Sequence, residues 1–287
     1  MQPVLAKLLD LLRLETIEET VYRGQSQDLG WGRVFGGQVL GQALSAAEHT
    51  VPAERAVHSL HAYFLRPGDA KRPIVYMVDP IRDGRSFTTR RVVALQGGKA
   101  IFNLAASFHI AEEGFSHADD APKDVPPPED LLSQAQLAEE WTAGMPEPLR
   151  RRATAVRPIE IRPIDPVNPR APETRPPRRR AWFKAIDLLP DDPVVHRYLL
   201  AYASDFHFLT ASLLPHGVSW LTPGIQMASL DHAMYFLRPF RMDEWLLYDV
   251  ESISATGARS LARGRFFDQA GNLVASTVQE GLIRDRR

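Results

Sequence analysis

The feature that most constrains the fold of this chain is an internal repeat. The pentapeptide Tyr-Phe-Leu-Arg-Pro occurs twice, at residues 63–67 and 235–239. In both copies a strand-like run precedes it and a second run follows. Next come a turn with an Arg-Ser pair, a third strand, a glycine turn and a last strand with an Ala-Ser pair. Because these features recur in one order at similar spacing, we infer two copies of one structural unit.

Each copy also has a predicted helix ahead of its strands. In the first copy, Gly36 and Gly37 open an Ala- and Leu-rich helix that reaches Glu48. In the second copy, a helical pattern covers 192–200, and Ser204-Asp205 is expected to open another helix over 206–214, because acceptor side chains suit the free N–H groups of a helix start. A helix lying on a curved antiparallel sheet is the hotdog unit. The predicted fold class is therefore α+β: a double hotdog, two tandem helix-on-antiparallel-sheet repeats packed into one unit.

Prolines gather between the two copies and predict the domain boundaries. Proline fixes φ and lacks an N–H, so the middle of the chain favours irregular structure, with a short helix over 130–141 and an edge strand over 156–161. We predict an N-terminal repeat over 1–113, a linker over 114–150 and a C-terminal repeat over 151–287.

Composition excludes whole classes of function. The 34 basic and 35 acidic residues nearly balance, so no strong field attracts nucleic acid. Without cysteine, the chain has no disulfide and no thiolate nucleophile, which fits a cytoplasmic location. The first residues predict an amphipathic helix rather than a signal peptide. No apolar run reaches the roughly 18 residues that a membrane span needs, so none is expected.

Familiar catalytic and metal-binding motifs are missing from the sequence. His58 and His61 lie three apart in a strand pattern and so point to opposite faces, which makes them a poor pair of metal ligands. There is no Gly-x-Ser-x-Gly nucleophile elbow. The glycines between residues 30 and 37 lack the Lys-Ser/Thr of a phosphate-binding loop. We therefore expect neither a metal nor a bound cofactor.

Three polar side chains of the second copy have no equivalent in the first. Asp205, Ser229 and Gln279, each taken alone, fit structural roles as a helix cap, a strand hydroxyl and a strand amide. Alignment of the Leu-Arg-Pro motifs puts Val57 opposite Ser229, and alignment of the Ala-Ser pairs puts Ile110 opposite Gln279. The first helix has no carboxylate before its end. Packing alone does not require this asymmetry, so we predict one site, in the C-terminal repeat.

Long stretches of the sequence closely resemble the acyl-CoA thioesterase II family. They are residues 34–43, 204–209, 223–232, 238–240 and 276–281. The resemblance covers nearly the whole chain and implies an acyl-CoA hydrolase whose catalytic aspartate, hydroxyl residue and glutamine are Asp205, Ser229 and Gln279. Bacterial relatives often have threonine where this chain has Ser229, but both residues supply a hydroxyl.

The implied reaction needs an oriented water, a proton acceptor and stabilisation of the oxyanion. Asp205 is expected to accept the proton, and Ser229 and Gln279 to hold the water. The backbone N–H groups of Gly36 and Gly37, at a helix start, are candidates to stabilise the oxyanion. Direct attack by Asp205, giving an anhydride, is the alternative route.

The substrate implied is a fatty acyl-CoA, whose acyl chain needs an apolar slot between helix and sheet. An aromatic-rich set of side chains either lines this slot or forms ordinary core. The set is Phe206, Phe208, Leu209, Tyr235 and Phe236. An enoyl-CoA hydratase and a non-catalytic acyl-CoA sensor are the rival hypotheses. Open sheet edges favour a homo-oligomer.

Overall fold

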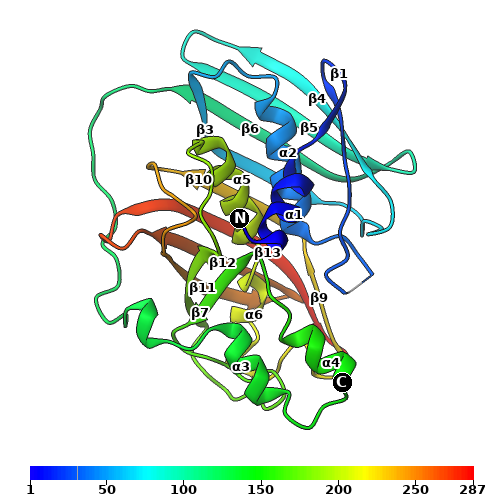
Figure 1. Ribbon diagram of the computed structural model, residues 1–287, viewed down its shortest axis with the longest axis vertical. Coiled ribbons are helices and arrows are strands. Elements are labelled where there is room, and N and C mark those ends of the chain that lie inside the picture. Colours follow the sequence, from blue (N-terminus) through cyan, green and yellow to red (C-terminus); the bar gives the residue numbers. More distant parts are fainter. Residues whose placement is uncertain (31) are drawn as a thin grey trace.

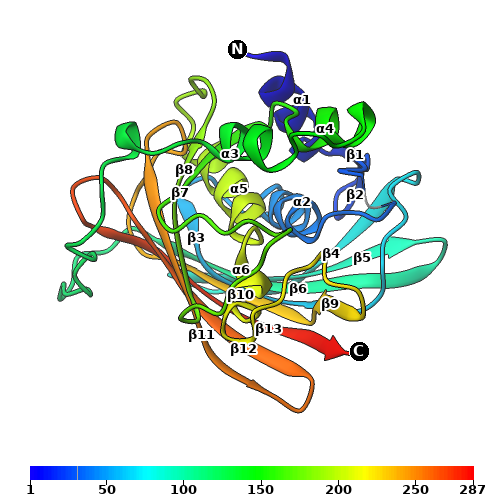
Figure 2. The same ribbon diagram turned by 90° about the horizontal axis from the view of Figure 1, so that it is seen from below.

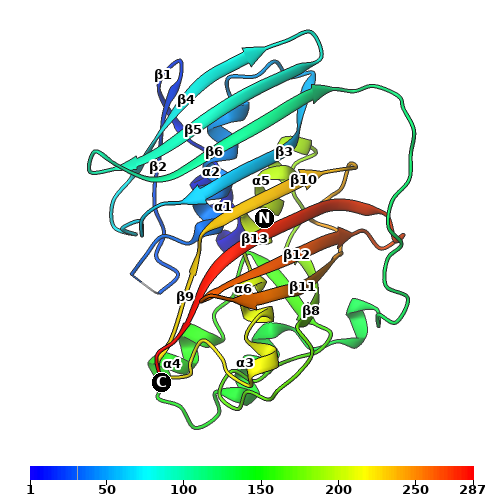
Figure 3. The same ribbon diagram turned by 180° about the vertical axis from the view of Figure 1, so that it is seen from behind.

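The computed structural model describes residues 1–30 and 32–287, and within them thirteen strands form one antiparallel sheet. The strands are β1 (Glu15–Glu18), β2 (Val21–Gly24), β3 (Arg55–Phe64), β4 (Ile74–Asp83), β5 (Phe87–Gln96), β6 (Lys99–Ile110), β7 (Ile159–Pro163), β8 (Arg178–Ala185), β9 (Ile225–Ser229), β10 (Asp231–Phe236), β11 (Leu246–Thr256), β12 (Arg259–Phe267) and β13 (Leu273–Asp285). Their order across the sheet is β1-β2-β4-β5-β6-β3-β10-β13-β12-β11-β8-β7, with β9 beside β13 (Figures 1 and 3). The two repeats therefore meet where β3 pairs with β10.

The sheet curves around two central helices, as Figure 2 shows. The α-helices are α1 (Pro3–Leu12), α2 (Gly36–Glu48), α3 (Gln134–Trp141), α4 (Glu147–Ala153), α5 (Pro193–Ser204) and α6 (Phe208–Ala211), and short 3₁₀ turns cover Pro128–Asp130 and Leu214–His216. Helix α2 belongs to the first repeat and α5 to the second, and they pack against each other. This arrangement matches the predicted double hotdog.

Glycine allows α2 and α5 to approach closely. A Cβ built on Gly37 would lie 2.2 Å from the carbonyl oxygen of Tyr202, and one on Gly41 would lie 3.2 Å from that of Tyr198. Contacts below about 3 Å do not occur between real Cβ atoms and backbone, so a side chain at position 37 would force the helices apart. The start of α2 is thereby held against the end of α5.

The register of the central strand pair confirms the internal duplication. Tyr63 pairs with Asp231, and Ser59 pairs with Tyr235. In the alignment of the two pentapeptides, Tyr63 corresponds to Tyr235 and Ser59 corresponds to Asp231, so the two pairs are equivalent. The pair His61–Ala233 therefore lies on a pseudo-twofold axis that relates the two repeats. The register of β3 against β6 shifts between Val57 and Ser59, and the break between β9 and β10 falls at the corresponding place.

The predicted helix start at Asp205 was wrong. Helix α5 continues to Ser204, and Asp205 is the residue that follows its last turn. His207 then adopts a left-handed conformation with φ of 69°, and the next helix begins only at Phe208. The tertiary structure decides this boundary, since the last turns of α5 are buried and pack against α2 of the other repeat.

Other expectations of local structure are confirmed. The amphipathic N-terminal helix is α1, which buries Leu5, Leu8 and Leu12. The short helix of the middle segment is α3, and the proline-containing strand β7 lies at an edge of the sheet, where a missing N–H is tolerated. In the described part of the chain, no helix combines the length and apolarity needed to cross a bilayer.

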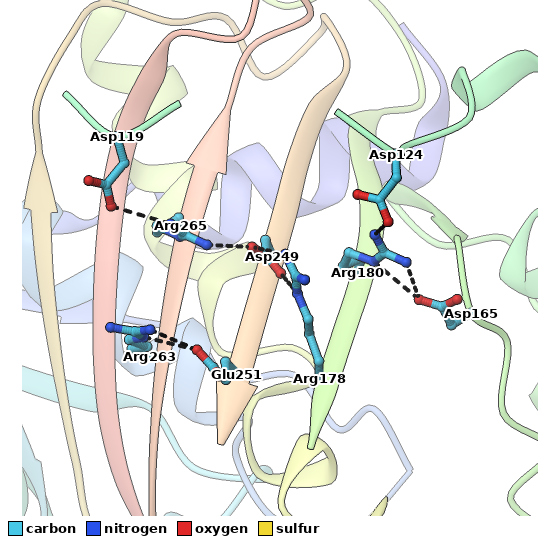
Figure 4. Close-up of polar contacts among 9 residues, drawn as sticks. All are labelled: Asp119, Asp124, Asp165, Arg178, Arg180, Asp249, Glu251, Arg263 and Arg265. Atoms are coloured by element: carbon cyan, nitrogen blue, oxygen red, sulfur yellow. Dashed lines mark hydrogen bonds and ion pairs between the residues drawn. The ribbon is translucent and has the colours of Figure 1, made fainter. Parts of the chain in front are cut away.

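The segment between the repeats packs against the outer face of the second half of the sheet. A small apolar cluster there contains Trp182, Trp245, Leu247, Phe267 and Leu273, and Ala121, Val125 and Leu131 of this segment pack on it. Arginines on the strands also make ion pairs with this segment (Figure 4). Asp119 pairs with Arg265, and Asp124 with Arg180. The segment therefore holds a defined place on the sheet.

Candidate active site

Asp205 lies at the contact between the two repeats. It follows the last residue of α5, and its Oδ2 accepts a hydrogen bond of 2.9 Å from the backbone N–H of Gly37 in the first turn of α2. The N-cap residue of α2 is Phe35, whose hydrocarbon side chain cannot accept a hydrogen bond from the helix. The carboxylate of one repeat thus caps the helix of the other, where the positive end of the helix dipole favours a negative charge.

Gln279 brings the three candidate side chains together. It lies on β13 with only 1% of its surface exposed. Its Nε2 donates to the Oγ of Ser229 on β9 at 2.7 Å and to the Oδ1 of Asp205 at 3.3 Å. The carboxylate, the hydroxyl and the amide therefore form one hydrogen-bonded group, although they come from three separate segments of the chain.

The environment of Asp205 changes its acidity. Burial raises the pKa of Asp205 to about 7, while hydrogen bonds from Gln279, Gly37 and Ser229 act in the opposite direction. Desolvation disfavours the charged form of a carboxyl group, and here it outweighs three donors. A carboxylate with a pKa near neutrality suits the transfer of protons at physiological pH.

His232 completes the group, and the sequence interpretation gave it no role. Its Nδ1 lies 2.7 Å from the Oε1 of Gln279, and its Nε2 lies 3.0 Å from the Oγ of Ser204. The side chain is fully buried on β10, and burial lowers its pKa to about 4, so it is neutral near pH 7. The alternation of β10 was the available signal, because it puts His232 on the same buried face as Met234.

Comparison with known proteins identifies the family. A model of the acyl-CoA thioesterase family matches residues 154–282, and a model of the acyl-CoA thioesterase N-terminal domain matches residues 26–109. Acyl-CoA thioesterase 2 of Haemophilus influenzae is 43% identical over 284 residues, which cover 99% of each chain. The chain belongs to the acyl-CoA thioesterase II family. The prediction that this thioesterase is an acyl-CoA hydrolase is thereby confirmed.

Further relatives support the same conclusion. Human acyl-coenzyme A thioesterase 8 is 40% identical over 281 residues, which cover 96% of this chain and 88% of the relative. The crystal structure of an acyl-CoA thioesterase II, TesB2, from Mycobacterium marinum is 42% identical and matches with a TM-score of 0.79 over 97% of this chain and 98% of that one. A hot dog fold protein from Alicyclobacillus acidocaldarius, 21% identical, matches with a TM-score of 0.75 over 97% and 98% and supports the fold alone.

Gly36 and Gly37, at the start of α2, lie directly against the carboxylate of Asp205. A Cβ on Gly36 would lie 2.6 Å from the Oδ2 of Asp205 and 2.9 Å from the ring of Phe64. The N–H of Gly37 is already bound to Asp205. Among the described residues, the N–H of Gly36 has no hydrogen-bond acceptor. Of the two predicted oxyanion donors, Gly36 is therefore the one whose N–H is available.

The first repeat of the thioesterase has apolar residues at the equivalent positions. Val57 is the counterpart of Ser229, as the sequence alignment predicted, because both lie next to the break in their strands. The predicted counterpart of Gln279, Ile110, was wrong. His232 lies opposite Gln279, because its neighbour Ala233 pairs with Val278. Leu60 corresponds to His232 and pairs with Ala106, so Ala106 is the counterpart of Gln279. The Ala-Ser pairs gave the wrong alignment because they do not occupy equivalent places in the two strands. Ala275 pairs with Phe236, whereas the equivalent Phe64 pairs with Phe102 rather than with Ala106.

The aromatic-rich set of the thioesterase divides between core and surface. Phe208 is buried, and Phe206 stacks on Phe35 with ring centroids 4.5 Å apart. Tyr235 is 38% exposed and contacts His61 on the outer face, so it does not line a slot between helix and sheet. No group of side chains suited to a metal ion occurs in residues 1–30 and 32–287.

Proposed function

We propose that this protein hydrolyses fatty acyl-CoA to a free fatty acid and coenzyme A by means of a water molecule activated at Asp205, Ser229 and Gln279. The main support is the position of the Gln279 amide, which donates to both Asp205 and Ser229. A water held beside these groups has an acceptor for its proton and a hydroxyl to bond. Its oxygen is then oriented toward a thioester carbonyl.

The reaction proceeds in two stages. Water attacks the carbonyl carbon while Asp205 takes its proton, and the carbonyl oxygen becomes an oxyanion. The N–H of Gly36, at the positive end of α2, is the proposed oxyanion donor. The C–S bond then breaks, and the proton on Asp205 passes to the sulfur to release coenzyme A as a thiol.

A general-base role for Asp205 fits its contacts better than direct attack. Both carboxylate oxygens accept hydrogen bonds, Oδ1 from Gln279 and Oδ2 from Gly37. These donors hold the carboxylate in place and reduce the electron density available for attack on carbon. A pKa near 7 also matches the demand on a base that must both take and return a proton.

Release of free thiol from palmitoyl-CoA tests this function directly. A thioesterase releases thiol, whereas a hydratase changes the absorbance of an enoyl-CoA without releasing thiol, and a sensor does neither. We expect thiol release. Absence of thiol release from a folded protein across acyl chain lengths would refute the function. The cytoplasmic location and the homo-oligomer stay predictions.

A further inference from the structure

A buried hydrogen-bonded chain leads from the candidate site into the core of the second repeat. It runs from Asp205 through Gln279 and His232 to Ser204. Gln279 and His232 are 1% and 0% exposed, and Ser204 is equally buried. Each of these polar atoms must therefore find its partner inside the protein, which limits the orientations open to each group.

The orientation of the Gln279 amide decides whether the site is assembled. With Nε2 toward the site, the amide donates to Ser229 and to Asp205, and its Oε1 meets the Nδ1 of His232. With the amide turned over, Oε1 would lie 3.3 Å from the carboxylate of Asp205, which in its ionised form is acceptor against acceptor. The productive orientation therefore requires that the Nδ1 of His232 carries a proton.

The tautomer of His232 depends in turn on Ser204. A neutral imidazole with its proton on Nδ1 has an acceptor at Nε2, and the hydroxyl of Ser204 lies 3.0 Å from that nitrogen. The same hydroxyl is 2.9 Å from the carbonyl of Ala201, which competes for its proton. If Ser204 bonded only Ala201, the imidazole could carry its proton on Nε2 instead, and the amide of Gln279 would lose its donor.

Ser204 is also the residue next to Asp205 at the end of α5. Its carbonyl accepts a hydrogen bond of 2.9 Å from the hydroxyl of Tyr248 on β11. The same helix end therefore places the carboxylate directly and, through Ser204, fixes the imidazole that orients the amide.

We propose that His232 is a positioning residue of this enzyme: its Nδ1–H holds Gln279 in the one amide orientation that presents Nε2 to Asp205 and Ser229. This inference rests on the proposed function, since it assigns His232 a task in placing the catalytic water. His232 does not touch the water or the substrate. Its effect on the reaction passes through Gln279.

Two substitutions at His232 separate positioning from packing. His232→Leu removes the donor, and His232→Asn keeps an N–H close to the position of Nδ1. Misplacement of a catalytic group costs up to about 100-fold, so we expect His232→Leu to lower kcat about 10- to 100-fold with little change in KM. His232→Asn should restore most of the loss. Equal kcat values for wild type and His232→Leu would overturn the proposal.

His196 supplies the matched control. His196 is also a buried histidine, 2% exposed, and burial lowers its pKa. It lies near the start of α5, at the opposite end of the helix from Asp205. Its Nδ1 accepts a hydrogen bond from the backbone N–H of Met242. His196→Leu should lower the melting temperature without lowering the kcat of the folded fraction. A loss of kcat as large as that of His232→Leu would show that any buried histidine has this effect, which contradicts positioning.

The tautomer can be measured without reference to activity. Nitrogen-15 NMR of the intact protein with labelled histidine should show His232 protonated at Nδ1 and not at Nε2 at about pH 8 to 9, where Asp205 is ionised and His232 is well above its pKa of about 4. Protonation at Nε2 would overturn the proposal even if the enzyme were fully active. Conversely, an Nδ1–H tautomer in a protein that releases no thiol would refute the proposed function alone.

Discussion

Replacement of Asp205 by asparagine tests the catalytic proposal most directly. The asparagine side chain would keep an oxygen for the N–H of Gly37 but could not accept a proton from water. Loss of a general base costs roughly 10²- to 10⁴-fold in rate. We therefore expect Asp205→Asn to lower kcat by at least about 10²-fold in a protein that remains folded.

The same substitution should change how stability depends on pH. The pKa of Asp205 is about 7 in the folded protein, against a reference value of 3.8. Below about pH 4 the group is protonated in both states and contributes no pH dependence. Between about pH 4 and 7 only the unfolded chain ionises, so the wild type loses stability as pH rises. A shift of about three units corresponds to at most about 4 kcal/mol.

Urea unfolding at a series of pH values measures this effect, together with thiol release from palmitoyl-CoA. The free energy of unfolding of the wild type should fall relative to that of Asp205→Asn as pH rises from about 4 to 7. The slope is the readout, because the amide introduced by the substitution also faces the Nε2 of Gln279, and this donor-to-donor contact lowers the stability of the variant at every pH.

Asp249 provides a carboxylate with the opposite behaviour (Figure 4). Burial raises its pKa, but ion pairs with Arg178 at 2.7 Å and Arg265 at 2.8 Å outweigh that effect and leave the pKa below its usual value. Its contribution to stability is present at neutral pH and lost as pH falls. Asp249→Asn should therefore be less stable than wild type at neutral pH, by a margin that shrinks on acidification, with normal kcat.

Two results would refute the reasoning about Asp205. Near-normal turnover of folded Asp205→Asn would reduce the residue to a cap of α2. Parallel stability curves for wild type and Asp205→Asn between about pH 4 and 8 would show that its pKa is not raised. Ionisation of the neighbouring tyrosines does not confuse this range, because burial raises the pKa values of Tyr202 and Tyr248.

Four further predictions concern the same site. The kcat/KM of the wild type should rise with pH through a pKa of about 7, since Asp205 must be ionised to accept a proton; a profile that is flat from about pH 5 to 9 contradicts this. Ser229→Thr should stay active and Ser229→Ala should lose activity; equal rates for both would remove the hydroxyl from the mechanism. Gly36→Ala should lower kcat because its Cβ meets the carboxylate, whereas Gly41→Ala, on the same helix, should lower only stability. Titration with a non-hydrolysable acyl-CoA analogue should count one site per chain, and two sites would contradict the apolar character of the first repeat.

Much of the fold could be predicted from the sequence because the chain repeats itself. Two copies of a long motif report the same structural unit twice, and the strand register confirms their equivalence at Tyr63 and Tyr235. Strand-like runs around each copy of the motif predicted strands of both repeats, and the proline-rich middle predicted α3 and the edge strand β7. The Ala-Ser pairs are too short to define a strand register. They predicted Ile110 as the counterpart of Gln279, whereas the sheet puts Ala106 there.

The sequence by itself determined which residue types were available for chemistry: one copy has Asp205, Ser229 and Gln279, and the other has no such set. Only the tertiary structure decided that these side chains meet. Asp205 has the local signature of a helix start, yet it follows the last turn of α5, whose buried face packs against the other repeat. Its raised pKa, its contact with Gly37 and the role of His232 all depend on atoms that lie far away along the chain. Desolvation and hydrogen bonding depend on which groups surround a side chain in the folded protein, and no local pattern of residues specifies those neighbours.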